Sequence, residues 1–178
     1  PSEILNTLRQ QALPHGGTEC LSNLRAYTRD FKTLGTFSER DCIVKNAVRV
    51  NSYKDTKLSG PITLSCPMAL RFGEYLQELK PNNITHNGSY NCRNISNSIM
   101  LSEHSYGNAI DITKIDEASV LSDWIKITSN GKKIRESYDL ACKYFSNILS
   151  PDSNEAHRDH LHLDIGFGRA CYLKWLTD

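Results

Sequence analysis

The chain has 178 residues, enough for one domain with a substantial hydrophobic core. It carries 21 lysines and arginines against 20 aspartates and glutamates, without the basic surplus that is typical of nucleic-acid-binding proteins. This charge balance makes nucleic acid an unexpected partner. No apolar stretch is long enough to span a bilayer, so we expect no membrane-spanning segment. The opening residues, PSEILNTLRQQ, lack the basic start and apolar stretch of a signal peptide, and export cannot be read from this end.

The first half of the chain predicts a helix, two strands and a second helix, after a lead-in over residues 1–17. Thr18 can cap a helix, because CLSNLRAYTRDF places apolar residues at helical spacing. CIVKNAVRVNSY from Cys42 is rich in strand-forming residues, and GPITLS from Gly60 is a second candidate strand. PMALRFGEYLQEL opens with Pro67 at a favourable first helical position and ends before Pro81.

The second half predicts short strands and one long helix. GSYNCR predicts a strand within the polar segment 82–97, and DWIKI, which starts at Asp123, predicts another before a turn at SNGK. KIRESYDLACKYFSNIL, residues 133–149, is the strongest helical pattern, and Pro151 follows it. Its apolar face would hold Ile134, Tyr138, Ala141, Phe145 and Leu149. Strands and helices do not alternate regularly, so we predict an α+β fold over residues 18–178, with a central antiparallel sheet flanked by helices.

Six cysteines are spread along the chain, and none falls in a CxxC pair, which argues against zinc-ribbon or thioredoxin chemistry. An even number of widely spaced cysteines favours three disulfides in an oxidising compartment; buried free thiols in a cytosolic protein are the alternative. We expect one pair between neighbouring elements and another between the chain ends, which often lie close together. The predicted pairs are Cys42–Cys66, Cys92–Cys142 and Cys20–Cys171.

The stretch HRDHLHLD, residues 157–164, places histidines in strict alternation with leucines. In a strand, His160, His162 and Asp164 would share one face, because successive side chains point to opposite sides. Leu161, Leu163 and Ile165 would then face the core. Two alternating histidines are an unusual way to build a solvated face, so this pattern indicates a functional site.

The stretch LSEHSYGNAIDI, residues 101–112, places His104 seven positions before Asp111. A straight strand would separate them by roughly 23 Å and a straight helix by about 10 Å, too far for both to bind one ion. The chain must therefore fold back, and Gly107 and Asn108 tolerate the positive φ that such a bend requires. AIDI would then resume a strand with its isoleucines facing away from Asp111.

Together, His104, Asp111 and His162 form a set that suits a catalytic zinc ion with an open fourth position. If His160 also bound the metal, the site would be closed and structural. Ordinary surface or core histidines without a metal are the remaining interpretation.

Several stretches resemble the extensin-like C-terminal family of bacterial proteins. They are SYNCR (89–93), LSEHSYGNAIDI (101–112), DWI (123–125), ACKYFSNILSPDSN (141–154) and HRDHLHLD (157–164), and the resemblance runs from about Cys20 to Cys171. That family is similar to the zinc peptidases grouped with lysostaphin, the D-alanyl-D-alanine peptidases and hedgehog domains. Their shared signature is His-x6-Asp followed by His-x-His.

This resemblance implies that His104, Asp111 and His162 are the zinc ligands. It places Arg93 where the D-alanyl-D-alanine peptidases keep an arginine near the scissile carbonyl, and a guanidinium there could stabilise an oxyanion. Relatives supply the general base from the position of Asp159 or of His160. On a strand His160 points with His162 and Asp159 points away, so we favour His160, assisted by His157 or Asp159.

The implied function is a monomeric, periplasmic or secreted zinc peptidase that cleaves peptidoglycan stem peptides at a D-amino acid amide bond. A non-catalytic zinc module that binds cell wall or a protein partner is the second hypothesis. A disulfide-stabilised wall-binding domain without metal is the third. The sequence has no Gly-x-Ser-x-Gly elbow, phosphate-binding loop or dinucleotide fingerprint that would favour another enzyme class.

Overall fold

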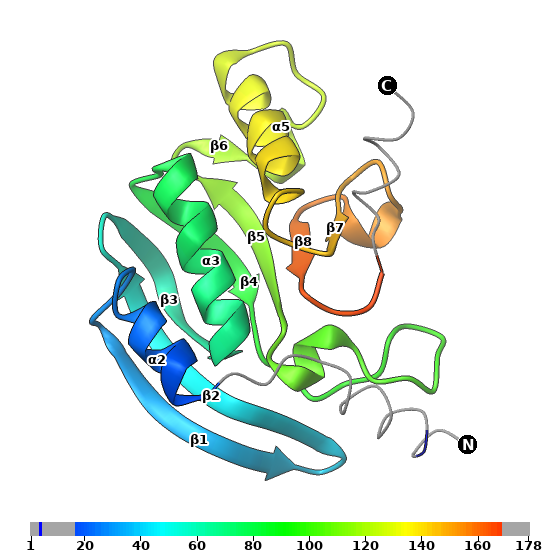
Figure 1. Ribbon diagram of the computed structural model, residues 1–178. Helices are drawn as coiled ribbons and strands as arrows, with labels where there is room; N and C mark the ends of the chain where they lie inside the picture. Colours follow the sequence, from blue (N-terminus) through cyan, green and yellow to red (C-terminus); the bar gives the residue numbers. More distant parts are fainter. Residues whose placement is uncertain (1–3, 5–16, 169–178) are drawn as a thin grey trace.

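The computed structural model describes residue 4 and residues 17–168, in which helices pack on one twisted sheet (Figure 1). The strands are β1 (Phe31–Glu39), β2 (Cys42–Tyr53), β3 (Thr56–Ser65), β4 (Asn83–Gly88), β5 (Ala109–Ile115), β6 (Ala118–Ser119), β7 (Asn147–Leu149) and β8 (Leu161–Asp164). The helices are α2 (Thr18–Leu24), α3 (Cys66–Leu79), α4 (Val120–Asp123) and α5 (Ser129–Ala141), with 3-10 turns η1 (Glu103–Tyr106) and η2 (Glu155–His157). Within the described residues, no helix is both long enough and apolar enough to cross a bilayer.

The strands lie in the order β1-β2-β3-β4-β5-β8-β7, and β6 pairs with β5. Neighbouring strands are antiparallel except for β3 and β4, which run parallel. Helix α3 connects these two strands, and a helical crossover of this kind lets the next strand run in the same direction. The predicted α+β fold is confirmed, but the sheet is mixed rather than purely antiparallel.

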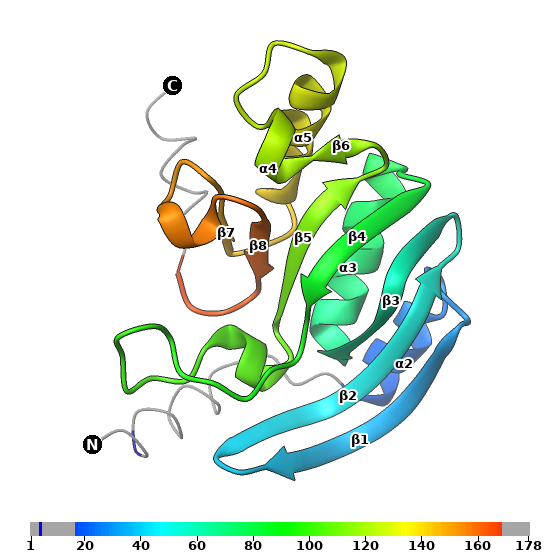
Figure 2. The same ribbon diagram turned by 180° about the vertical axis from the view of Figure 1, so that it is seen from behind.

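The main core lies between the sheet and α3. Alternate residues of β2 and β3, such as Val50 and Ile62, are fully buried, and α3 buries Met68, Phe72 and Tyr75 at helical spacing. Burial of each such side chain stabilises the fold by roughly 1.5–3 kcal/mol. Helices α2 and α3 lie on one side of β1 to β4, and no described helix covers the opposite side (Figures 1 and 2).

In the first half, β2 matches the predicted strand from Cys42, and β3 and α3 match their predicted positions. The helix predicted from Thr18 is too long, because α2 ends at Leu24 and Phe31 begins β1. Strand β1 was not predicted. It is an edge strand in which exposed residues and the positive φ of Gly35 hide the alternation of a half-buried strand. The lead-in over residues 1–17 lies outside the described residues, except for Ile4 and Gly17.

In the second half, four local predictions are wrong. DWIKI is no strand: its first residue, Asp123, ends the short helix α4, and Ile125 and Ile127 are exposed. SNGK is the first turn of α5, because the Thr128 hydroxyl accepts a hydrogen bond from the Gly131 amide at 3.2 Å. The predicted helix over 133–149 ends at Ala141, and residues 147–149 form β7. The GSYNCR strand is displaced to β4, which ends at Gly88.

Two disulfides join four of the described cysteines, Cys20–Cys66 and Cys42–Cys92. All three predicted pairings are therefore wrong, because each used one of these four cysteines with a different partner. Packing of α2 against the start of α3 brings Cys20 to Cys66. The loop after β4 returns to the tip of the β1–β2 hairpin and brings Cys92 to Cys42 (Figure 1).

The bend between the two predicted site residues is made by Gly107. Its φ of +67° is left-handed, and a Cβ there would lie 2.8 Å from the Ser65 amide nitrogen and 2.9 Å from Val44 Cγ1. Asn108 needs no positive φ; its side-chain oxygen accepts a hydrogen bond from the Ser65 hydroxyl at 2.6 Å. The chain therefore folds back as predicted, with a single glycine at the turn.

We expect Gly107→Ala to lower the free energy of unfolding by about 2–4 kcal/mol, because the added methyl group meets backbone and the conformation is strained. Gly60→Ala is the matched control, since a Cβ at Gly60 meets no atom within 4 Å and its φ is not left-handed. Urea unfolding of both variants measures the difference. Equal stability of the two variants would contradict the assigned role of Gly107.

Candidate metal centre

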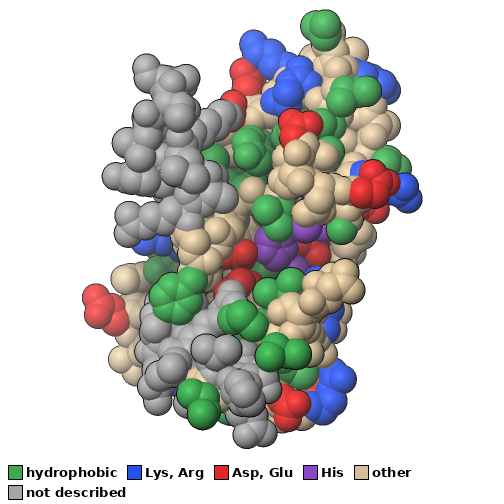
Figure 3. Space-filling model, turned by 90° about the vertical axis from the view of Figure 1, so that its right-hand side faces the viewer, with side chains coloured by type: hydrophobic (Ala, Val, Ile, Leu, Met, Phe, Trp, Pro, Cys, Tyr) green, Lys and Arg blue, Asp and Glu red, His purple; other side chains and the backbone are tan. Residues whose placement is uncertain are grey.

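The structure brings together His104, Asp111 and His162, which come from three separate elements. His104 lies on η1, Asp111 on β5 and His162 on β8. Asp111 and His162 are direct partners in the antiparallel pairing of β5 with β8, and Gly107 turns η1 back toward them. One possible ligand atom from each residue lies within 4.8 Å of the other two. Histidine side chains gather in a hollow at mid-height of the molecule, next to acidic side chains (Figure 3).

The inward-facing atoms of the three side chains nearly touch. His104 Nε2 lies 3.1 Å from His162 Nδ1 and 3.2 Å from Asp111 Oδ2, and His162 Nδ1 lies 3.0 Å from Asp111 Oδ1. His104 is 2% exposed and His162 is 8% exposed. Three polar groups thus converge in a place that is largely closed to solvent.

The outward-facing nitrogens of both histidines are fixed by acceptors. His104 Nδ1 lies 2.6 Å from the carbonyl oxygen of Ser89, and His162 Nε2 lies 2.8 Å from Asp164 Oδ2. Carbonyl and carboxylate oxygens only accept, so both outward nitrogens must carry protons. Asp164 is itself held, because its other oxygen accepts from the Asn147 side chain and from the Gly166 amide, each at 2.8 Å. This arrangement orients the inward nitrogens toward Asp111.

The pKa shifts describe a site that stabilises positive charge. Burial alone would raise the pKa of Asp111, but hydrogen bonds from His104 and His162 outweigh burial and hold it well below its usual range. Burial would lower the pKa of His162, but hydrogen bonds to Asp111 and Asp164 outweigh it and raise the pKa to about 9. These groups therefore favour a positive charge between them, either a proton on His162 or a metal ion that displaces it.

The alternation predicted for HLHLD is present in β8. Leu161 and Leu163 are buried in the core, and His162 faces the site. The strand starts one residue after His160, yet the His160 side chain still faces the site, with its Nε2 3.7 Å from Asp111 Oδ1. Its Nδ1 lies 2.8 Å from Asp159 Oδ1, and hydrogen bonding to His160 lowers the pKa of Asp159.

His157 lies at the rim of this cluster. Its ring centroid is 4.9 Å from that of His160 and 5.9 Å from that of His162. Burial, followed by the neighbouring charges of His160 and His162, lowers its pKa to about 4. His157 is therefore neutral at neutral pH.

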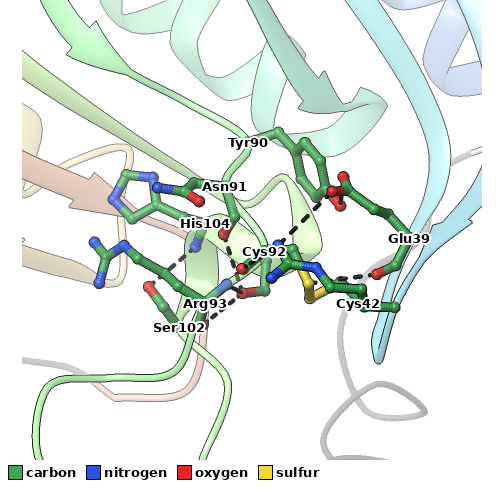
Figure 4. Close-up of a disulfide and its surroundings, with 10 residues drawn as sticks. Glu39, Cys42, Tyr90, Asn91, Cys92, Arg93, Ser102 and His104 are labelled. Atoms are coloured by element: carbon green, nitrogen blue, oxygen red, sulfur yellow. Dashed lines mark hydrogen bonds and ion pairs between the residues drawn. A yellow bond between two sulfur atoms is a disulfide. The ribbon is translucent and has the colours of Figure 1, made fainter.

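Arg93 follows Cys92 on the loop between β4 and η1, and its backbone is held from both sides. Its amide donates to the Ser105 hydroxyl at 2.9 Å, and the Cys42–Cys92 disulfide ties the preceding residue to the β1–β2 hairpin. The Arg93 guanidinium and the His104 imidazole extend to the same side of this loop (Figure 4). The charge of Arg93 also contributes to lowering the pKa of His157.

The sequence profile of the extensin-like protein C-terminus family matches residues 18–172. The chain belongs to this family. No curated protein and no solved structure shows significant similarity to the chain. The matched region includes all the metal-centre residues described above.

Three supporting groups at the centre were not identified from the sequence. Asp164 was placed on the site face but given no role, and its position two residues after His162 was the available signal. The Ser89 carbonyl is a backbone group, and Asn147 comes from a segment that was predicted to be helical. Neither carries a recognisable sequence signal, because only the folded chain brings Ser89 to His104 and Asn147 to Asp164.

Asp164 leads to a testable prediction. We expect Asp164→Asn to weaken zinc binding by roughly 10–100-fold, because a neutral amide orients and polarises His162 less well than a carboxylate. Asp152→Asn is the matched control, since Asp152 accepts from the Trp124 indole at 3.0 Å, away from the three clustered residues. Competition with a zinc-binding dye measures both affinities. Equal affinities would show that Asp164 has no role in supporting the metal.

Proposed function

We propose that this chain is a zinc-dependent peptidase that cleaves peptidoglycan stem peptides at a D-amino acid amide bond, as the kinship with lysostaphin-type and D-alanyl-D-alanine peptidases implies. The observation that carries the proposal is the orientation of the two histidines. Each outward nitrogen faces an acceptor, from Ser89 or Asp164, so each ring in its neutral form turns a lone pair inward. Metal binding would displace the inward proton that His162 holds at its raised pKa of about 9. Two lone pairs and the Asp111 carboxylate then meet in one buried place.

Two lone pairs and a carboxylate that converge in this way repel one another unless a proton or a metal ion lies between them. Two imidazole nitrogens and one carboxylate are a usual ligand set for catalytic zinc, which keeps a further position open. Hydrogen bonds from the outward nitrogens to carboxylate or carbonyl groups are the usual support for zinc-binding histidines. The residues therefore fit zinc, with His104, Asp111 and His162 as its ligands. When bound, zinc would supply Lewis acidity, lowering the pKa of water and polarising an amide carbonyl.

His160 is the proposed proton carrier. Its Nε2 faces the centre and its Nδ1 is held by Asp159, a pairing that fixes the ring. His160 would take a proton from the attacking water and deliver it to the leaving amine. Arg93 is the proposed partner of the oxyanion, because its charged side chain extends to the side of His104 (Figure 4).

The proposed location is the bacterial envelope, as a periplasmic or secreted protein. Support comes from the two disulfides of the described residues, which form and persist in oxidising compartments. Peptidoglycan lies in such a compartment. We further propose that the protein acts as a monomer.

A non-catalytic zinc module is the second candidate. One observation favours it: His160 Nε2 lies only 3.7 Å from Asp111 Oδ1, so a small ring movement would make His160 a fourth ligand. Four protein ligands would close the site and leave no position for substrate. The protein would then use its zinc for structure while binding cell wall or a protein partner.

Digestion of purified sacculi tests the proposal. Zinc-loaded protein is expected to release muropeptides whose masses identify the cleaved bond, and chelation followed by zinc addition should abolish and restore this release. Protein denatured by heat is the blank. A zinc-loaded protein that binds sacculi but releases no muropeptide would favour the non-catalytic module.

A further inference from the structure

We propose that the uncovered side of the sheet binds a carboxylate-bearing peptide strand that extends from the metal centre. We call this surface the open face and define it by Lys32, Arg49, Lys57, Thr63 and Lys114. The identity of this ligand rests on the proposed function. The ligand is the part of a stem peptide that lies beyond the cleaved bond.

The strand register places these side chains on one side. Lys57 and Lys114 directly precede Leu58 and Ile115, which both pair with Ile84 and pack in the core, so the two lysines point to the opposite side. Arg49 lies between Val48 and Val50, which are fully buried against α3, so its side chain points away from the helices. Lys32 and Thr63 are the direct partners of Arg49 on β1 and β3, and paired residues share a face. Figure 2 looks onto this side of β1, β2 and β4, with α2 and α3 behind them.

The open face is continuous with the metal centre. Asp111 lies between the buried Ile110 and Ile112, so it projects on the same side as Arg49. Its partner on β4 is Gly88, whose φ is +140° and where a Cβ would meet no atom within 4 Å.

The next residue, Ser89, reaches β3. Its hydroxyl accepts from the Thr63 amide at 2.9 Å. A row of neighbouring residues on adjacent strands therefore crosses the sheet. It runs from Asp111 through Gly88 and Thr63 to Arg49 and Lys32. Glycine at such a position is typical where a ligand approaches the backbone closely.

The charge of this face calls for an anionic ligand. Its four basic residues are exposed, and none makes an ion pair with a described acidic side chain. Arg49 donates only to the Thr63 hydroxyl, at 3.4 Å. Asp30, the acidic residue directly before β1, already accepts hydrogen bonds from the Asn51 and Ser52 side chains at 2.8 Å each. The four basic residues are Lys32, Arg49, Lys57 and Lys114.

The spacing fits an extended peptide. Arg49 lies three strands from Asp111, which is roughly 15 Å at about 4.8 Å per strand. An extended chain covers that distance in about four residues. A carboxylate about four residues from the cleaved bond would therefore meet Arg49, and one slightly further would meet Lys32. Stem peptides of peptidoglycan carry free carboxylates along the chain, so they match this pattern.

Charge reversal tests the inference by binding rather than by activity. Lys32→Glu with Arg49→Glu is expected to weaken co-sedimentation of the full, zinc-loaded chain with sacculi by about tenfold or more, measured on ice. The matched control is Arg25→Glu with Lys54→Glu, which changes the net charge equally. Arg25 follows α2, and Lys54 lines a cavity beside α3, on the helix side. The control should bind within about twofold of the unaltered chain.

A second arm identifies the ligand group. Sacculi stripped of phosphate polymers are compared before and after amidation of their carboxylates, and amidation should lower binding of the unaltered chain to the level of the reversed variant. Equal losses in both charge variants would overturn the inference. So would undiminished binding to amidated sacculi, or binding that disappears once phosphate polymers are removed.

The two proposals fail separately. If the unaltered chain binds as expected but releases no muropeptide, the peptidase function is wrong and the open-face assignment stands. If muropeptides are released and charge reversal changes neither binding nor release, the open-face assignment alone is wrong.

Discussion

Replacement of His162 by alanine is expected to remove zinc from the protein and to lower muropeptide release by roughly 10³-fold or more. His162 supplies one of the three clustered ligand atoms of the described residues, and two of its contacts, to His104 Nε2 and Asp111 Oδ1, measure 3.1 and 3.0 Å. Without it, two ligands remain, too few to hold zinc against water. Elemental analysis of the purified variant gives the metal content directly.

His86→Ala is the matched control for this prediction. His86 lies on β4, and its Nε2 is 2.8 Å from the carbonyl oxygen of Gly60, away from the metal centre. We expect this variant to keep one zinc per chain, whatever stability it loses. The assignment fails if His162→Ala also keeps one zinc per chain, or if the unaltered protein itself binds no zinc.

Replacement of His160 by alanine is expected to leave zinc bound while muropeptide release falls by roughly 10²–10⁴-fold, the usual contribution of a general acid–base. His160 shares the site face with His162, but a three-ligand centre needs only one of them at the metal. Elemental analysis beside the release assay separates binding from turnover. The expected pair of results is full zinc content with little release.

Asp159→Asn provides the graded comparison, because the amide can still contact His160 Nδ1 but carries no charge. We expect a smaller loss of release than for His160→Ala, with zinc retained. Two other outcomes would revise the mechanism. Loss of zinc from His160→Ala would mean a closed, four-ligand site and would favour the non-catalytic module. Full zinc and full release would move the general base to Asp159 or His157.

Local patterns in the sequence were sufficient where one strand or helix determines its own side-chain directions. The alternation of HLHLD predicted that His162 faces away from Leu161 and Leu163, and β8 has this arrangement. Helix α3 was recognisable because Pro67 and the apolar spacing act within a few residues. The need for a bend between His104 and Asp111 followed from chain dimensions alone, and Gly107 provides it.

Only the tertiary structure decided features that depend on distant partners. Residues 147–149 have a helical pattern, yet they form β7, because pairing with β8 satisfies their backbone and brings Asn147 to Asp164. The disulfide predictions are wrong because cysteine spacing does not show which elements pack together. Packing of α2 against α3 determines one pair, and packing of the loop after β4 against the β1–β2 hairpin determines the other. The Ser89 carbonyl that orients His104 is a backbone group, and a pattern of side chains cannot predict where it lies. The sequence thus determined which residue types could bind a metal, and the fold decided which atoms orient them.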